Sequence, residues 1–456
     1  MTEPGVATPG EPPRTIAFYL PQFHPVPEND AWWEPGFTEW FNVVRARPLY
    51  DGHYQPHLPG ELGFYDLRLP ETRVAQARLA AEHGISGFCY YHYWFGGRQL
   101  LGRPFEEVLR SGEPDFPFCL CWANENWTRT WDAGTSEVLA EQRFDPDDDL
   151  AHIRWLVEAF RDPRYIRVQG RPLLLVYRPQ LLPDAVATFD LWRKVCADEG
   201  LPEPYLCKFD THEDFSDPAQ HGCDAAAEFL PHGIAGLVPR RPVGEDPERG
   251  PDVFDYTEVA AAFAERSTPP WRRYSCVVPG WDNTPRRSAQ RASLLHGADP
   301  AVYEEWLRRT LQRSAADGRG LVFVNAWNEW AEGAHLEPDQ RFGRAFLEAT
   351  RRAVAGCGRE PAADPAGRIG GADPAGRIGG APALRLAPYE DLYHDLYQRY
   401  VALQRLQSEQ LGLIQREAQR ALQQAAAETE EARRQARVLA ARVEQLEAAL
   451  RRDVAP

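Results

Sequence analysis

The chain contains the stretch Gly320-Leu321-Val322-Phe323-Val324-Asn325-Ala326, which runs directly into Trp327-Asn328-Glu329-Trp330-Ala331-Glu332-Gly333. Its first half is short and almost continuously apolar, as expected for a parallel strand that is covered on both faces. Seven earlier runs have the same character, and turn signals bound each of them. The eight predicted strands are residues 15–20, 85–91, 116–122, 171–177, 204–209, 225–230, 274–279 and 320–326.

Helical patterns separate these strands. They include residues 71–83, 149–160, 185–198, 301–316 and 344–354, and Gly84 follows the first of them at the position where helices end. Eight β-then-α units within residues 14–358 predict an α/β protein with a (β/α)₈ TIM barrel. A Rossmann fold is disfavoured, because residues 21–25 after the first strand contain no Gly-x-Gly-x-x-Gly motif.

The ends of the chain differ from the barrel in composition. Residues 1–13 are rich in Pro and Gly and are predicted to be disordered, and residues 359–387 form a predicted flexible linker. That linker repeats a nine-residue unit at 363–371 and 372–380. Residues 388–453 have apolar residues at three- and four-residue spacing, which predicts a coiled coil that self-associates or binds a partner, although a solitary charged helix is the alternative.

The bulk composition limits the compartment and the partners. The chain has 67 acidic and 51 basic residues, and its net charge of −16 disfavours binding to nucleic acid or anionic lipid. No secretory signal or membrane span is recognisable, which predicts a cytoplasmic protein. The eight cysteines are too sparse for a disulfide scaffold and are expected to be reduced core residues.

Polar and aromatic residues follow the predicted strands, where active sites of TIM barrels gather. Sugars present apolar C–H faces and hydroxyl rims, so a site for them needs aromatic rings beside carboxylates, amides and imidazoles. For any single aromatic residue, packing beneath a loop is an equally good interpretation. The predicted substrate-binding residues are Tyr19, Gln22, His24, Tyr90, His92, Trp94, Asn124, Glu125, Trp127, Lys208, Glu228, Trp281, Asp282, Asn325 and Trp327, and Tyr93 belongs to the same rim.

Glu329 and Glu332 are the best candidates for catalysis. In a helical turn, positions i and i+3 share a face, so a turn after strand eight brings the two carboxylates together. Glycosidic-bond chemistry uses such a pair, one ionised and the other protonated. The alternative is an ordinary acidic first turn of a helix, which the flanking Trp327 and Trp330 disfavour.

Other chemistries lack their motifs. His24, His57, His92, His232 and His335 show no metal-binding spacing and are expected to hydrogen-bond to substrate instead, so no metal or cofactor is predicted. No serine-hydrolase elbow or phosphate-binding loop occurs. The acidic run 145–149 is interpreted as the start of a helix.

Several motifs resemble one known family. They are Ala17-Phe18-Tyr19-Leu20-Pro21-Gln22-Phe23-His24-Pro25, Trp32-Trp33, Gly36-Phe37-Thr38-Glu39-Trp40, Cys89-Tyr90-Tyr91-His92-Tyr93-Trp94, Cys121-Trp122-Ala123-Asn124-Glu125-Asn126-Trp127 and the Trp327–Gly333 segment. Together they resemble the WbsX-like family of the glycoside hydrolase family 99 group over about residues 14–355. The resemblance adds Trp33, Glu39 and Trp40 to the predicted substrate-binding residues, beside His335.

The resemblance implies a function as well as a fold. Family 99 hydrolases are endo-acting retaining enzymes for α-mannosides and related glycans, with a (β/α)₈ barrel and no required cofactor. It implies that Glu329 is the base that deprotonates the sugar's 2-hydroxyl and that Glu332 is the acid/base. The usual retaining scheme instead uses one carboxylate as the nucleophile, and the sequence leaves both open.

Three hypotheses follow for the whole chain. The first is a retaining glycoside hydrolase or transglycosylase that acts on a cell-surface polysaccharide or its precursor. The second is a glycosyltransferase in O-antigen, lipopolysaccharide or capsule biosynthesis, because the WbsX-like branch is commonly given that label. The third is a non-catalytic glycan-binding scaffold, which the presence of both acids disfavours.

Overall fold

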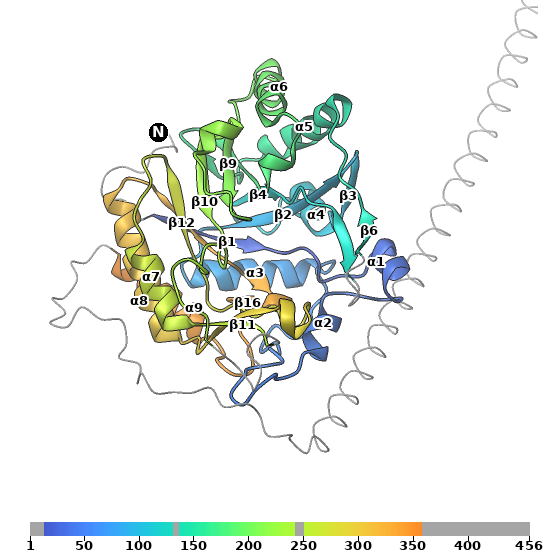
Figure 1. Cartoon of the computed structure of the whole chain (residues 1–456). Coiled ribbons are helices and arrows are strands. Elements are labelled where there is room, and N and C mark those ends of the chain that lie inside the picture. Colours follow the sequence, from blue (N-terminus) through green and yellow to red (C-terminus); the bar gives the residue numbers. More distant parts are fainter. Residues whose placement is uncertain (1–12, 131–135, 242–249, 358–456) are drawn as a thin grey trace, which may run out of the picture. The chain divides into compact units, whose positions relative to one another are not determined.

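The structure is a computed structural model, and it describes residues 13–130, 136–241 and 250–357. Eight parallel strands form a closed barrel in these residues (Figure 1). They are β1 (Arg14–Tyr19), β2 (Gly87–Phe95), β4 (Phe118–Trp122), β8 (Arg171–Val176), β9 (Tyr205–Asp210), β10 (Ala225–Glu228), β12 (Arg273–Val277) and β14 (Leu321–Val324). Each pairs with the next, and β14 pairs with β1, so the predicted strands and barrel are confirmed.

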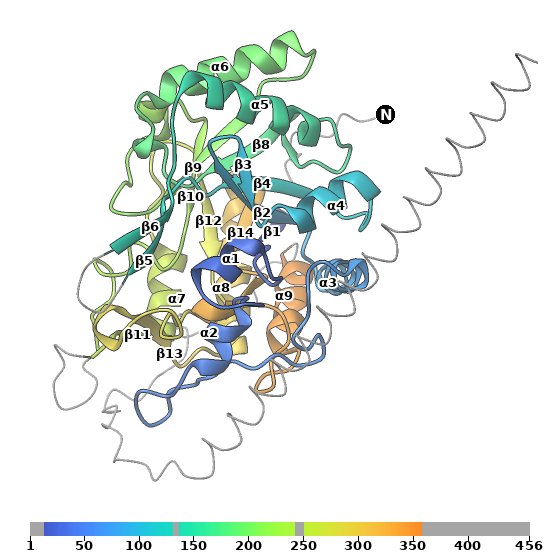
Figure 2. The ribbon, with the colours of Figure 1, turned by 90° about the vertical axis from the view of Figure 1, so that its right-hand side faces the viewer.

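Helices cover most of the outer surface. They are α1 (Pro27–Trp32), α2 (Trp40–Arg45), α3 (Pro70–Glu82), α4 (Arg103–Ser111), α5 (Pro146–Phe160), α6 (Ala185–Asp198), α7 (Tyr256–Glu265), α8 (Pro300–Ala316) and α9 (Ala345–Gly356). Helices α5 and α6 pack together on one side, and α7, α8 and α9 on another (Figure 2). Asp145 caps α5 by accepting hydrogen bonds from the backbone amides of Asp147 and Asp148, which confirms that the acidic run starts a helix.

The fifth unit departs from the regular pattern. Between β9 and β10 the chain forms only a short 3₁₀ turn, η2 (Pro218–His221), where the prediction of eight β-then-α units places a helix. Charged side chains lie beside this part of the wall instead. The Lys208 ammonium is buried and lies 3.5 Å from Asp210 and 3.3 Å from Asp214, and its Nζ donates to the Asp214 carbonyl.

Aromatic rings fill the inside of the barrel. Phe18 on β1 packs against Phe209, Phe229 and Phe323, with ring centroids 5.2 to 5.8 Å apart. Because side chains alternate along a strand, the neighbours of these residues point outward to the helices. All eight cysteines are free thiols and seven are buried, as expected for reduced core residues.

Short strands and 3₁₀ turns lie at the rim of the barrel and in its loops. The strands are β3 (Arg98–Leu100), β5 (Trp127–Thr130), β6 (Ser136–Ala140), β7 (Arg167–Val168), β11 (Asp252–Asp255), β13 (Ser293–His296), β15 (Asn328–Glu329) and β16 (Ala334–His335). The remaining 3₁₀ turns are η1 (Pro179–Leu181), η3 (Ala289–Arg291) and η4 (Trp330–Glu332). Of these elements, β15, η4 and β16 carry the candidate pair.

The predicted linker 359–387 and coiled coil 388–453 lie outside the described residues, as does almost all of the predicted disordered segment 1–13. Those three predictions therefore stay predictions. Within the described ranges, every helix is too short or too polar to cross a bilayer.

Candidate active site

The two candidate acids lie on a tight turn at the carboxyl end of the barrel, which we call the barrel mouth. β15 and β16 pair antiparallel, with Asn328 opposite His335, and the 3₁₀ turn η4 joins them. Glu329 precedes this turn and Glu332 ends it, so they occupy the two sides of one turn rather than a helix start. The predicted turn after strand eight is therefore present.

Gly333 lets the turn pack closely against the neighbouring loop. Its φ is +61°, and a Cβ at this position would lie 3.0 Å from both the Cβ and the backbone nitrogen of Asp282. The backbone amide of Asp282 donates to the carbonyl of Glu332 at 2.6 Å. A side chain at Gly333 would push the loop away, so this glycine fixes where Glu332 lies.

Arg286 binds both candidate acids and a third carboxylate. Its Nη2 lies 3.0 Å from an oxygen of Glu329, and its Nη1 lies 3.2 Å from an oxygen of Glu332. Nη2 also lies 3.0 Å from Glu39, to which Nε donates at 3.1 Å. We call Arg286, Glu39, Glu329 and Glu332 the carboxylate cluster. Burial opposes the charge of Arg286, but the three carboxylates raise its pKa, so the guanidinium stays charged.

Glu329 is the most buried acid of the carboxylate cluster. Its side chain is 7% exposed, against 22% for Glu332 and 18% for Glu39. Burial raises the pKa of Glu329 to about 8; Arg286 opposes this shift, whereas Glu332 and Glu39 add to it. A proton shared among these acids therefore resides on Glu329, and Gln22 donates to its second oxygen at 3.3 Å.

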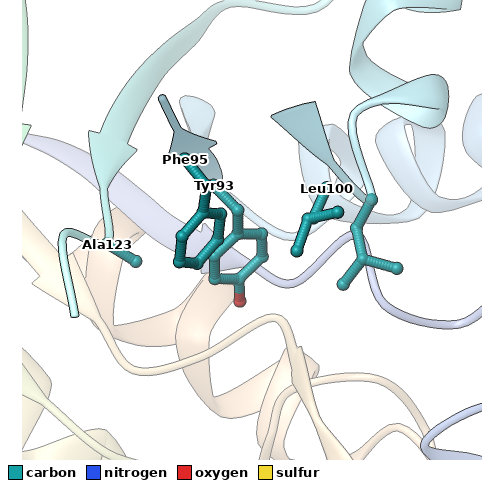
Figure 3. Packing of buried hydrophobic residues seen from close by; sticks show 5 residues of the cluster. Tyr93, Phe95, Leu100 and Ala123 are labelled. Atoms are coloured by element: carbon teal, nitrogen blue, oxygen red, sulfur yellow. The ribbon is translucent and has the colours of Figure 1, made fainter. Parts of the chain in front are cut away.

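Aromatic residues wall the cluster on the β2 side. Tyr93 is buried, and the charge of Glu329 adds to the burial that raises its pKa. Its ring lies 5.0 Å from that of Trp127, and it packs in one cluster with Phe95, Leu100 and Ala123 (Figure 3). A sugar ring next to the acids thus has an aromatic wall beside it.

A second charged group lies at the mouth on the β4 and β8 side. Glu125 forms an ion pair with Arg178 at 2.6 Å, and His212 lies 3.7 Å from the same carboxylate oxygen. Tyr177 connects this group to the pair, because burial, Glu125 and then Glu332 raise its pKa. The mouth therefore offers hydrogen-bonding groups on both sides of the pair.

A third glutamate of the same segment, Glu337, is bound quite differently. It is 2% exposed and accepts hydrogen bonds from Trp330 Nε1 at 2.7 Å, Tyr65 Oη at 2.7 Å and Gln76 Nε2 at 2.6 Å. Burial raises its pKa to about 7, although these donors oppose the shift. Neutral donors hold this carboxylate, so it positions the turn.

Six predicted substrate-binding residues lie on the outer face of the barrel, away from the mouth. Tyr19 donates to Gln76 of α3, and Tyr90 packs on Phe105 of α4. The ring of His92 stacks on Trp155, and that of Trp94 stacks on His152; both partners belong to α5. Lys208 and Glu228 pair with the charged groups along β9, β10 and β12. Strand alternation explains this placement, because their neighbours Phe18, Tyr91, Tyr93, Phe209 and Phe229 point inward.

Other predicted residues hold the rim together. Asn124 exchanges hydrogen bonds with the backbone of Arg178, and Asn325 donates to the Leu230 carbonyl. Trp40 and Trp327 are fully buried, and Trp40 packs 5.6 Å from Trp330.

The remaining predicted residues make contacts outside the carboxylate cluster. Trp281 donates to Ser293, and Asp282 pairs with His53 at 2.6 Å. His24 is buried, and Trp33 is 48% exposed and stacks on Phe37. His335 stacks on Trp330.

The sequence prediction missed Arg286, Tyr177 and Arg178. Tyr177 and Arg178 directly follow β8, so strand-end position was an available signal for these two, whereas Arg286 lies farther along the loop after β12. For Arg286 the signal was the charge balance: three carboxylates that are buried together at the barrel mouth need a positively charged side chain beside them.

The chain belongs to the Glycosyltransferase WbsX family, whose model matches residues 15–350. It is 49% identical over 347 residues to Uncharacterized protein WxcX of Xanthomonas campestris pv. campestris strain B100, covering 75% of this chain and 50% of the relative. The WxcX protein of strain ATCC 33913 is also 49% identical, over 354 residues, 76% of this chain and 51% of the relative. The chain spans about half the length of these curated relatives.

The solved structures that align with this one have low sequence identity to the chain. A glycoside hydrolase-like protein aligns with a TM-score of 0.48 and 14% identity, covering 77% of this chain and 97% of the other. A glycoside hydrolase family 99 endo-α-mannosidase from Bacteroides thetaiotaomicron aligns with a TM-score of 0.46 and 15% identity, covering 75% and 97%.

Proposed function

We propose that the protein is a retaining glycoside hydrolase that acts on a cell-surface polysaccharide or its precursor through Glu329 and Glu332. One observation carries the proposal: Arg286 holds both acids on one turn at the barrel mouth, and only Glu329 is deeply buried. Such an arrangement gives neighbouring carboxylates different proton affinities, which acid/base chemistry on a glycosidic bond requires.

In the proposed reaction, Glu329 and Glu332 share one proton, and the reactive form is the one in which Glu332 holds it. In that form Glu329 takes the proton of the sugar's 2-hydroxyl, and that oxygen displaces the leaving group at the anomeric carbon. Glu332 gives its proton to the departing oxygen as the glycosidic bond breaks. Water, deprotonated by Glu332, then opens the anhydro-sugar, and Glu329 returns its proton to the 2-oxygen. Each acid ends as it began, and the anomeric configuration is retained.

The environment of Glu329 supports its role as the base. A carboxylate with its ordinary pKa is a weak base, whereas a pKa of about 8 makes Glu329 a stronger base in the fraction of molecules in which it is ionised. Arg286 stays paired with Glu39 while Glu329 changes its charge, so the site keeps its geometry through the reaction.

A glycosyltransferase is the second candidate, and the name of the family favours it. The same barrel would then pass a sugar from a nucleotide donor to a growing O-antigen, lipopolysaccharide or capsule precursor. A transglycosylase is the intermediate case, in which a sugar hydroxyl replaces water in the second step.

The test is an incubation of the full-length protein in H₂¹⁸O with an array of α-linked oligosaccharides, and separately with sugar nucleotides plus acceptors. We expect shorter oligosaccharides that carry one ¹⁸O, seen by mass spectrometry, and no need for a nucleotide. The Glu329→Gln/Glu332→Gln double variant is the control and should form none of this product. Turnover that requires a sugar nucleotide and releases nucleotide would support the transferase instead.

A further inference from the structure

A cavity lies beside the turn that carries Glu329 and Glu332. Its volume is about 460 Å³, and its wall includes Gly333 at the end of the turn and Asp282 of the adjoining loop. Neither Glu329, Glu332 nor Arg286 lines it, so it is separate from the proposed catalytic centre. Three potential metal ligands face each other in its wall.

The three ligands are His57, His335 and Asp339, which we call the His-His-Asp cluster. One nitrogen or oxygen atom from each lies within 4.8 Å of the other two. His57 Nδ1 and His335 Nε2 are 2.9 Å apart, and His335 Nε2 lies 4.0 Å from a carboxylate oxygen of Asp339. Two imidazoles and a carboxylate are the ligand types that Zn²⁺ and Fe²⁺ use in proteins.

Neighbouring groups orient these ligands toward one point. His335 Nδ1 lies 3.0 Å from the Glu337 carbonyl, which can only accept, so Nδ1 carries the proton and Nε2 is the acceptor. Without an ion, this Nε2 accepts from His57 Nδ1, and an ion would replace that proton between the two rings. For Asp339, one oxygen accepts from the Phe342 amide at 2.6 Å and the other from the Tyr54 hydroxyl at 3.1 Å. Second partners of this kind typically fix metal ligands.

We propose that the His-His-Asp cluster binds one divalent transition-metal ion, with the cavity supplying water to the remaining coordination positions. Ligand atoms at ~2.0–2.2 Å from a tetrahedral Zn²⁺ lie about 3.4 Å apart. The present separations reach at most 4.8 Å. The ligand atoms must therefore move towards one another by about 1 Å to close around an ion. The adjoining cavity has room for several waters.

An ion at this cluster would brace the catalytic turn. His335 is the residue of β16 that pairs with Asn328 of β15, and its ring stacks on Trp330 with centroids 3.8 Å apart. Fixing His335 to His57 and Asp339 would therefore hold the strand pair that carries Glu329. Spacing along the chain could not reveal the cluster, because 278 residues separate His57 from His335.

The experiment uses tag-free, full-length protein that has been stripped with a chelator and is then titrated with Zn²⁺ by calorimetry. We expect one saturable site per chain and a rise in Tm on loading. His57→Gln and Asp339→Asn should each weaken Zn²⁺ binding roughly tenfold or more. His296→Gln is the matched control, because His296 lines the same cavity but contacts Tyr50 instead of the cluster, and it should keep the wild-type affinity.

A readout on the wild-type protein alone guards against variants that fail to fold. Zn²⁺ should slow amide hydrogen exchange in peptides that cover residues 327–337. The proposal is overturned by absence of stoichiometric binding, by equal affinity in the His57→Gln/Asp339→Asn variant, or by binding that leaves exchange in 327–337 unchanged. None of these outcomes bears on the Glu329–Glu332 proposal, which is tested by product formation.

Discussion

Glu329 and Glu337 lie eight residues apart, and both are buried glutamates whose pKa burial raises, to about 8 and about 7. Their partners differ. Glu337 is held by an indole, a phenol and an amide, none of which changes its charge. Glu329 shares the charged Arg286 with two other carboxylates.

The difference separates a carboxylate that holds the fold from one that is available for proton transfer. Neutral donors fix the Glu337 carboxylate in one position. At Glu329 the proton affinity depends on nearby charges that a substrate or a proton can alter. A raised pKa alone would not distinguish the two residues, whereas the nature of the partners does.

The largest expected effect is on turnover. Glu329→Gln keeps the size of the side chain but removes the proton acceptor, so we expect kcat to fall by roughly 10²–10⁴-fold. Glu337→Gln should change kcat far less, provided the variant is folded by circular dichroism. A Glu329→Gln enzyme with kcat within tenfold of the wild type would reverse the assignment of the two residues.

The next effect is on how the stability of the fold changes with pH. In the unfolded chain Glu329 has its ordinary pKa, so between about pH 4.5 and pH 8 folding must retain a proton that the unfolded chain has released. The wild type therefore loses stability across this window, and Glu329→Gln does not. At about 1.4 kcal/mol per pKa unit, we expect the variant to gain roughly 2–4 kcal/mol relative to the wild type from pH 5 to pH 9. Urea unfolding at the two pH values measures the difference, and an equal offset at both would contradict it.

Glu337→Gln should lower the stability of the protein at neutral pH. The new amide group must face either Gln76 or the pair Trp330 and Tyr65, all of which donate to Glu337. A donor facing a donor in a buried site leaves one group unsatisfied, which costs about 1–3 kcal/mol. Urea unfolding at pH 7 checks this, with Glu61→Gln, an exposed partner of Arg344, as a control that should change much less. Wild-type stability in Glu337→Gln would show that the network adapts.

Much of the fold was predictable because periodicity is local. The eight strands and five of the helices, such as Ala185–Asp198, follow from apolar runs and capping residues. The missing helix between β9 and β10 was not predictable in this way. The buried charges of Lys208 and its partners in that region depend on contacts that no local pattern records.

The site was predictable in part, for a related reason. The Glu-x-x-Glu spacing reveals Glu329 and Glu332, because a turn brings them together. Side chains along a strand face inward and outward in turn, so either Tyr91 or His92 faces inward. An error of one residue in the expected register exchanges the two. Arg286 was missed because its partners, Glu39 and the turn that carries Glu329 and Glu332, come from two segments far from it in the sequence.

The smallest expected effect is a shift in the pH dependence of kcat/KM. The active form holds one proton between Glu329 and Glu332, so the limb of the kcat/KM profile that reports the raised pKa of Glu329 should have its midpoint near pH 8. Glu39→Gln removes a negative charge that raises the pKa of Glu329, so the midpoint should move to lower pH. Arg286→Gln removes the positive charge that lowers it, so the midpoint should move to higher pH. Each shift should be about 0.5–1 pH unit. The midpoint is independent of the height of the profile, so a variant that also binds substrate poorly still gives an answer. Shifts of both variants in the same direction would mean that Glu329 is not the titrating base, and the charged neighbours that set it apart from Glu337 would then have no part in catalysis.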